Sequence, residues 1–129
     1  MQNIPIKEIF ARKDTAALIR YAEQKGQELV TTGLSTSQIR NILDAIQAMH
    51  TYDYDCLQLL RAKLAYAAGK KREVESFRQI LEEAISCVKD KDSFIFFRNF
   101  VEAIVAYHTL AESRKKSEKK ENFPERRNR

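Results

Sequence analysis

The chain has 129 residues, which is long enough for one domain that buries a core without disulfides or a bound metal. Its 43% hydrophobic content, with only three glycines and two prolines, favours an all-α fold, and no apolar run is long enough to span a membrane. The net charge of +5 resides in residues 113–129, where eight Lys/Arg accompany three Glu. Residues 1–112 are therefore neutral overall, which is a weaker indication of nucleic-acid binding than a basic globule.

Residues 1–13 carry several isoleucines but are too short to fold alone, so we expect an arm or a single helical turn packed on the main body. Asp14 or Thr15 can cap a first long helix, and Gly33 ends it. Gly26 lies within the apolar stripe of that helix, where glycine costs roughly 1 kcal/mol relative to alanine. A close helix crossing explains this glycine, and a kink is the alternative.

The segment Ser35-Thr-Ser-Gln38 is typical of a capping box, in which the serine hydroxyl and the glutamine amide each satisfy a free backbone amide. It predicts a second helix that ends near His50. Asp53 or Asp55 can cap a third helix, which Gly69 closes. The apolar residues of these two helices recur at helical spacing and are Ile39, Ile42, Leu43, Ile46 and Met49, followed by Leu57, Leu60, Leu64 and Ala67.

Three consecutive cations, Lys70, Lys71 and Arg72, follow the third helix directly. They suit the carbonyl end of that helix but lie unfavourably at the amide end of the fourth helix, whose apolar face runs from Val74 to Val88. A bound anion would relieve this repulsion.

The last helix is apolar on nearly every side, with Phe94, Phe96, Phe97, Phe100, Val101, Ala103, Ile104, Tyr107, His108 and Leu110 on adjoining faces. Asp90 or Asp92 begins it, and such a helix must be surrounded by others. Beyond Glu112 the apolar periodicity ends. We therefore predict one helical domain over 1–112 and a basic, flexible tail over 113–129, with a frayed helix end followed by disorder. The tail either contacts nucleic acid or only increases solubility.

Catalytic and metal-binding chemistry is not visible in the sequence. His50, His108, Cys56 and Cys87 have no short ligand spacing and fall on different elements, so no metal site is expected. His108 is interpreted as a core histidine, and the cysteines as small buried groups in a protein of the reducing cytoplasm. Because no phosphate loop or nucleophile arrangement can be assembled, we expect a protein without enzymatic activity or cofactor.

What remains is a set of cations at outward positions: Arg40, Arg61, Lys63, Lys70, Lys71, Arg72 and Arg98. They form a candidate phosphate-binding surface. The alternative for each is a solvated or ion-paired side chain, such as Arg40 with Asp44 or Arg98 with Glu102.

Three segments carry a family resemblance: Gly33-Leu-Ser-Thr-Ser-Gln-Ile-Arg40, Leu60-Arg-Ala-Lys-Leu-Ala-Tyr-Ala-Ala-Gly69 and Phe100-Val-Glu-Ala-Ile-Val-Ala-Tyr-His108. Together they resemble the Csm-type small subunit of type III-A CRISPR effector complexes, in the family's order and across residues 15–108. Two departures are Ala62, where many members have proline, and the basic tail beyond the point where many members end.

The resemblance implies a compact, non-catalytic helical subunit of a prokaryotic antiviral ribonucleoprotein. Several copies would stack along the guide (CRISPR) RNA and its target RNA, next to the RNase backbone subunits and the large polymerase-like subunit. Base pairing would supply sequence specificity, so the seven cations named above would contact only the RNA backbone. The competing interpretation is a helical scaffold that joins subunits without binding RNA directly.

Overall fold

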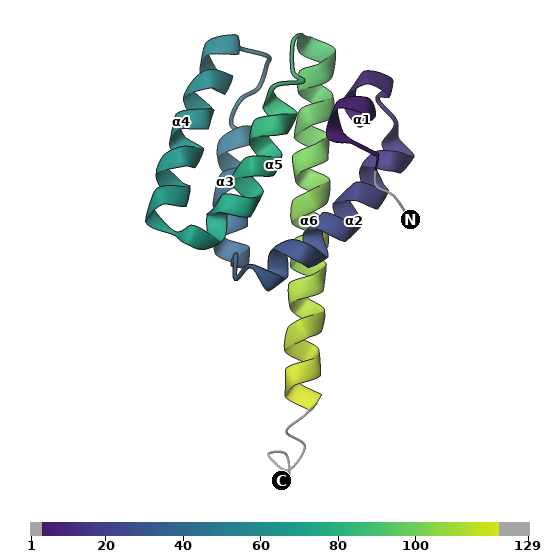
Figure 1. The fold of residues 1–129 in the computed structure, drawn as a ribbon, viewed down its shortest axis with the longest axis vertical. Helices are drawn as coiled ribbons and strands as arrows, with labels where there is room; N and C mark the ends of the chain where they lie inside the picture. Colours follow the sequence, from purple (N-terminus) through teal and green to yellow (C-terminus); the bar gives the residue numbers. More distant parts are fainter. Residues whose placement is uncertain (1–3, 122–129) are drawn as a thin grey trace.

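The computed structural model describes residues 4–121, which form helices and no strand (Figure 1). The elements in chain order are α1 (Ile6–Arg12), α2 (Thr15–Thr31), α3 (Thr36–Gln47), α4 (Tyr54–Lys70), the short 3-10 helix η1 (Arg72–Val74), α5 (Glu75–Ile85) and α6 (Lys91–Glu121). The prediction of an all-α bundle is confirmed. The N-terminal arm is α1, which buries Ile6, Ile9 and Phe10 against the body.

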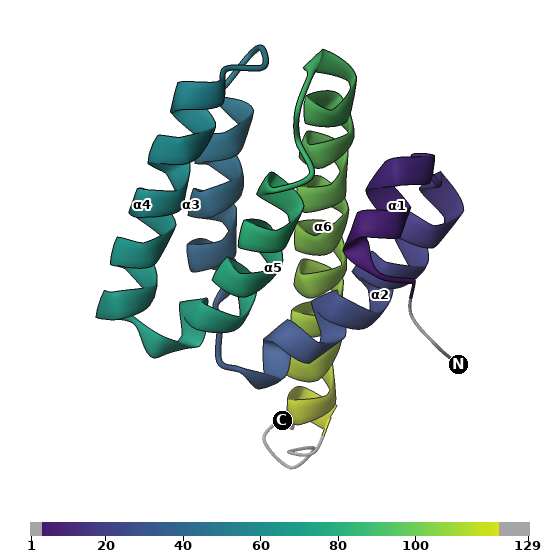
Figure 2. The same ribbon diagram turned by 45° about the horizontal axis from the view of Figure 1, so that its top comes forward.

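Helix α6 is the centre of the bundle, as its apolar sequence predicts. Its most extensive contact is with α2, and it also packs against α3, α1 and α5 (Figures 1 and 2). Phe97, Phe100 and Ile104 have no solvent exposure at all. Such large side chains supply most of the stabilisation from apolar burial, roughly 1.5–3 kcal/mol for each one.

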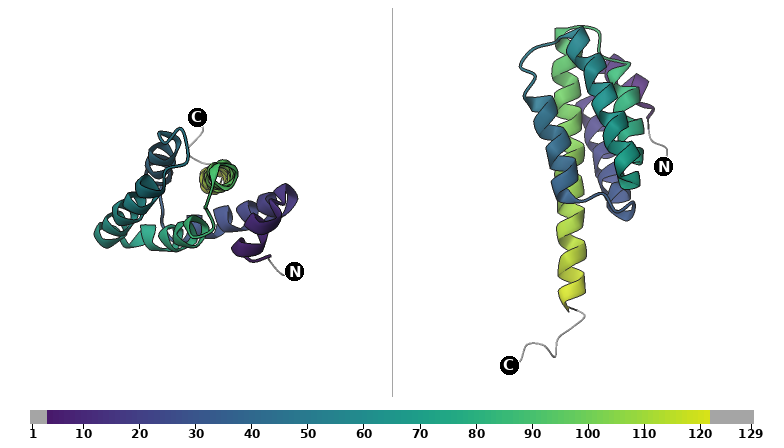
Figure 3. Two further views of the ribbon diagram at one scale, coloured as in Figure 1. Left: turned by 90° about the horizontal axis from the view of Figure 1, so that it is seen from above. Right: turned by 90° about the vertical axis from the view of Figure 1, so that its left-hand side faces the viewer.

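One side of α6 stays open to solvent, because the other helices gather on the opposite side (Figure 3). Ile95 and Leu110 lie along this open side and are 47% and 42% exposed. The prediction that Leu110 fills a buried face is therefore wrong. Leu110 lines a cleft with Glu23 and Gln27 of α2 but is not enclosed there, so its apolar character does not guarantee a packing partner.

The α2–α6 crossing explains Gly26. A Cβ atom at this position would lie 2.6 Å from the backbone nitrogen of His108 and 2.7 Å from the carbonyl carbon of Tyr107. These distances are shorter than van der Waals contact, so only glycine lets the two backbones approach this closely. The close crossing is therefore confirmed as the reason for this glycine, and α2 runs without interruption from Thr15 to Thr31.

The helix starts follow the predicted capping chemistry. The capping box at Ser35 is complete, since its hydroxyl oxygen accepts from Gln38 N at 3.1 Å and the Gln38 side chain accepts from Ser35 N at 2.9 Å. In the three places where two residues were candidates, the first of each pair caps the helix: Asp14, Asp53 and Asp90, whose carboxylates accept from Ala17 N, Cys56 N and Ser93 N. Gly33, with φ of +89°, ends the turn after α2 as predicted.

The C-terminal helix differs from the prediction in length. We expected helical structure to fray beyond Glu112, but α6 continues to Glu121 and projects past the end of the bundle (Figure 3). Arginine, lysine and glutamate are good helix formers, so the segment needs no apolar face to stay helical. Residues 122–129 lie outside the described residues, and the division of the chain at residue 112 stays a prediction.

Candidate nucleic-acid interface

The Lys70–Arg72 cluster lies at the junction between α4 and α5. Lys70 is the last residue of α4, Lys71 follows it, and Arg72 begins η1. All three side chains are exposed, and within residues 4–121 none of them takes part in an ion pair. This junction therefore presents three adjacent positive charges to solvent, as the sequence predicts.

The start of η1 and α5 carries negative as well as positive charges, whereas the sequence analysis considered only the three cations there. Glu73 and Glu75 lie in its first turns, where carboxylates favour exposed amides. Arg78 donates to both carboxylate oxygens of Glu75, each at 2.8 Å, and this lowers the Glu75 pKa to about 2. The cations at the junction are thus accompanied by carboxylates, so anion binding there has to rely on exposed lysine and arginine charge rather than on the helix end.

Lys63 and Arg40 are exposed on α4 and α3, respectively. Lys63 and Lys70 are seven residues apart on α4, so they lie on the same side of that helix. Arg40 has no ion pair with Asp44 in the described part of the chain. These two cations remain candidates for contact with an anionic partner.

Arg61 and Arg98 contact the protein itself. The Nε atom of Arg61 lies 2.8 Å from Oε1 of Glu82, which connects α4 to α5, and its Nη1 atom donates to Gln58. Arg98 is half-buried, and its Nη2 atom lies 3.5 Å from the carbonyl oxygen of Gln47, the last residue of α3. A cation is favourable at that carbonyl end. The structure therefore does not bring Arg98 together with the exposed cations, and Arg61 already has a carboxylate partner.

Sequence reasoning did not identify Tyr66 and Asn41, which border a groove beside Lys70 and Lys71. Tyr66 is 69% exposed, and the Nζ atom of Lys70 lies 5.5 Å from the centre of its ring. The sequence does contain an indication: Leu59 and Tyr66 are seven residues apart and fall outside the buried stripe of α4. Both are exposed, as this spacing would have predicted.

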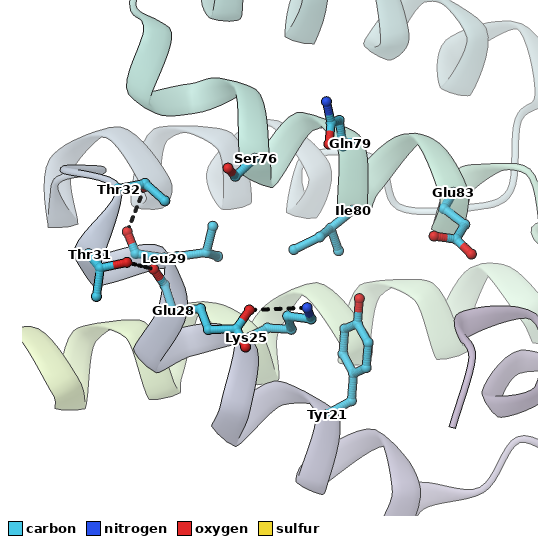
Figure 4. A pocket seen from close by; sticks show the side chains of 10 residues that line it. All are labelled: Tyr21, Lys25, Glu28, Leu29, Thr31, Thr32, Ser76, Gln79, Ile80 and Glu83. Atoms are coloured by element: carbon cyan, nitrogen blue, oxygen red, sulfur yellow. Dashed lines mark hydrogen bonds and ion pairs between the residues drawn. The ribbon is translucent and has the colours of Figure 1, made fainter. Parts of the chain in front are cut away.

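A second cleft, of about 520 Å³, lies between α2 and α5 (Figure 4). Lys25 and Glu28 pair with each other along the α2 side of the cleft at 3.1 Å, and Tyr21 points towards the wall formed by Ile80 and Glu83. Burial raises the pKa of Tyr21, and the charges of Glu83 and Glu28 add to the effect. Two carboxylates and one ammonium group make this cleft acidic, so it is a poor site for phosphate.

The histidine and cysteine predictions have mixed outcomes. His108 is fully buried, and its Nε2 atom lies 2.7 Å from the carbonyl oxygen of Leu34, which confirms the core interpretation. Cys87 is half-buried, but Cys56 is exposed, so its predicted burial is wrong. Cys56 lies in the first turn of α4, three residues after the Asp53 cap, and is not part of the buried stripe of that helix. Among residues 4–121, no group of three or more potential metal ligands comes together.

The comparisons with known proteins identify the family to which the chain belongs. None of the described helices is long and apolar enough to cross a membrane. Residues 12–114 match the family model described as Csm2 Type III-A. A protein of Enterococcus italicus named "CRISPR system Cms protein Csm2" is 31% identical over 117 residues, covering 76% of this chain and 84% of that protein. No solved structure matches the chain significantly. The chain therefore belongs to the Csm2 family of type III-A CRISPR systems.

Proposed function

We propose that the chain is a non-catalytic small subunit of a type III-A interference complex, in which several copies stack along the guide RNA and the target RNA. Family membership is the observation that carries this proposal, because the match covers residues 12–114. The subunit acts in the prokaryotic cytoplasm, beside the RNase backbone subunits and the large polymerase-like subunit.

The RNA contacts in this proposal are to the backbone and independent of sequence. Lys70, Lys71 and Arg72 make the main contribution, since they are exposed and adjacent. Lys63 and Arg40 extend the contact along α4 and α3. Arg61 and Arg98 were included in the predicted surface, and we now assign them a smaller direct contribution because each already contacts the protein.

A titration of the full chain with single-stranded RNA at several salt concentrations tests the backbone contacts. Each phosphate contact contributes about −0.7 to the slope of log K against log[salt] for a single strand. The triple variant Lys70→Glu, Lys71→Glu and Arg72→Glu should lower the affinity for all RNA sequences and flatten the slope by up to about 2 units.

A matched control reverses three other exposed lysines, Lys7, Lys13 and Lys89, which lie near the opposite end of α5. This variant has the same net charge as the first one. If both variants lose affinity equally, the effect reflects overall charge rather than the α4–α5 junction. If neither variant changes RNA binding, also in the assembled complex, the proposed contact at this junction is wrong.

A helical scaffold that joins subunits is the second candidate function. It is favoured by apolar side chains on the outer face of α4, opposite its buried stripe, where Leu59 and Tyr66 are 63% and 69% exposed. Exposed apolar side chains of this size on one helix are typical of protein contact surfaces. Under this alternative, Leu59→Lys would impair assembly of the complex, while charge reversal at Lys70 to Arg72 would leave target-RNA protection unchanged.

A further inference from the structure

A groove of about 290 Å³ lies between α3 and α4, and η1 closes one of its ends. Ile42, Ala67 and Val74 give it an apolar floor. Ligand sites in proteins typically have volumes of about 300–1,000 Å³. The groove is at the small end of this range, so it can hold one ring system but not a helix or a longer peptide.

The side of the groove formed by α4 offers an aromatic face. Tyr66 is 69% exposed, so little of its ring is covered by the protein itself. The ammonium group of Lys70 lies 5.5 Å from the ring centre. An exposed ring next to an apolar floor favours a flat, aromatic ligand, because stacking removes the apolar surfaces of both partners from water.

The side formed by α3 offers a polar edge. Two amide side chains, Gln38 and Asn41, border the groove. Gln38 is already engaged, since it accepts from Ser35 N and donates to Glu73 at 3.0 Å. Asn41 is exposed, and within the described residues its side chain makes no hydrogen bond to the protein. It is therefore the group that can donate to, and accept from, the edge of a ligand.

The charged end of the groove favours an anion. Lys70 and Lys71 line this end, and both are exposed. Glu73 lies close by, but its carboxylate accepts a hydrogen bond from Gln38, and it offsets only part of the adjacent positive charge. A ligand that combines a flat aromatic ring, hydrogen-bonding edges and a negative group within one short length is a nucleotide.

We propose that this groove binds one unpaired RNA nucleotide, with its base stacked on Tyr66 and its phosphate at Lys70 and Lys71. Asn41 contacts the edge of the base. This inference rests on the proposed function and makes it more specific, because backbone contacts alone do not require an unpaired base. A base within a duplex is stacked on its neighbours and does not present its face to the groove.

The chain contains no tryptophan, so Tyr66→Trp introduces a single fluorescent reporter at the site. We expect a short oligouridylate to quench this fluorescence on binding. The same oligonucleotide with abasic positions keeps its phosphates and should give little quenching. Tyr54→Trp is the matched control, because Tyr54 is 62% exposed at the other end of α4, and its signal should not change with either probe.

Tyr66→Ala tests the stacking without a reporter group. It should lower the affinity for single-stranded RNA about 5- to 160-fold, which corresponds to about 1–3 kcal/mol per stacked base. The salt slope should not change, because no phosphate contact is removed. Circular dichroism should be that of the unsubstituted chain, since the side chain is largely exposed.

The results separate this inference from the proposed function. Two results would refute the nucleotide site while RNA still binds with the expected salt slope. In the first, the abasic probe quenches Tyr66→Trp as strongly as the oligouridylate does. In the second, Tyr66→Ala binds RNA as well as the unsubstituted chain, and in either case the backbone contacts of the proposed function stand. If neither probe binds the full chain at all, the nucleotide site and the proposed backbone contacts are both refuted. Reduced affinity of Tyr66→Ala with an unchanged slope supports the site.

Discussion

Helices α6 and α4 are both rich in apolar residues, but the fold uses them in opposite ways. Helix α6 buries most of its apolar side chains against α2 and α3, whereas α4 buries one stripe against α5 and η1 and leaves Leu59 and Tyr66 exposed. The difference shows that apolar content alone does not separate core from contact surface. What separates them is whether the apolar residues occupy adjoining faces of the helix or a second face opposite the buried stripe.

The strongest test of this difference is the removal of one large side chain from each helix. Phe100→Ala should lower the free energy of unfolding by about 3–5 kcal/mol, because it leaves a cavity at a position with no solvent exposure. Leu59→Ala, on α4, should change it by less than about 0.5 kcal/mol. Urea denaturation measures both. A Phe100→Ala variant as stable as the unsubstituted chain would contradict the central position of α6.

Two glycines provide a second test. Gly26→Ala should lower the free energy of unfolding by about 1–3 kcal/mol, because the new methyl group collides with the backbone of α6. Gly69→Ala, in the last turn of α4, meets no atom within 4 Å and should raise it by about 0.5–1 kcal/mol through helix propensity. Thermal melts of the two variants should move in opposite directions. If the melting temperature of Gly26→Ala rises as that of Gly69→Ala does, the α2–α6 crossing can widen without a loss of stability.

The attachment of α4 to the bundle is expected to depend only weakly on charge. Arg61→Ala removes the contact to Glu82 on α5 and should lower the free energy of unfolding by about 0.2–1 kcal/mol, because the pair is solvent-exposed. A double-mutant cycle with Glu82→Ala isolates the pair. A coupling energy well above this range would mean that α4 is held by charge rather than by its buried leucines.

Acid should weaken the start of α5. The Glu75 pKa is lowered from 4.5 to about 2 by hydrogen bonds from Arg78, so its contribution to stability is complete above about pH 4.5 and is lost as the pH falls towards 2. Glu75→Gln should therefore show a smaller loss of stability over this range. Urea denaturation at several pH values measures the difference, and identical profiles for the two proteins would contradict it.

The smallest effect is expected from truncation after Glu112. Residues 113–117 are exposed and contribute no side chain to the core, so the melting temperature should hardly change. RNA affinity measured on the same protein would show whether the removed lysines and arginines contact the RNA. A large drop in stability would show that the projecting part of α6 supports the bundle.

Local patterns explain why much of the fold could be predicted. Capping by Ser35 and Gln38 depends on residues three positions apart, and the buried stripe of α5 follows from spacing alone. The exposure of Leu110 and Cys56 could not be predicted in this way, because it depends on which sides of α6 and α4 the other helices cover. Whether an apolar residue is covered is a property of the assembled bundle.

The candidate site was harder to predict than the fold. Arg61 pairs with a residue 21 positions away, and Arg98 contacts one 51 positions away, so nothing in their local sequence distinguished them from free surface cations. The groove beside Tyr66 likewise exists only because α3 and α4 lie next to each other. Single exposed cations such as Lys70 could be recognised from spacing, but their surroundings could not.

The position of α6 in the chain has a consequence for how the protein folds. The helix that completes the core is synthesised after all of its partners, and its main partner, α2, ends 60 residues before α6 begins. Until α6 has left the ribosome, the apolar faces of α2 and α3 lack the helix that buries them. Bringing α6 into contact with α2 also closes a long loop of chain, which has an entropic cost. We therefore expect slower folding than in a bundle of sequential neighbours, and a need for protection of the incomplete chain during its synthesis.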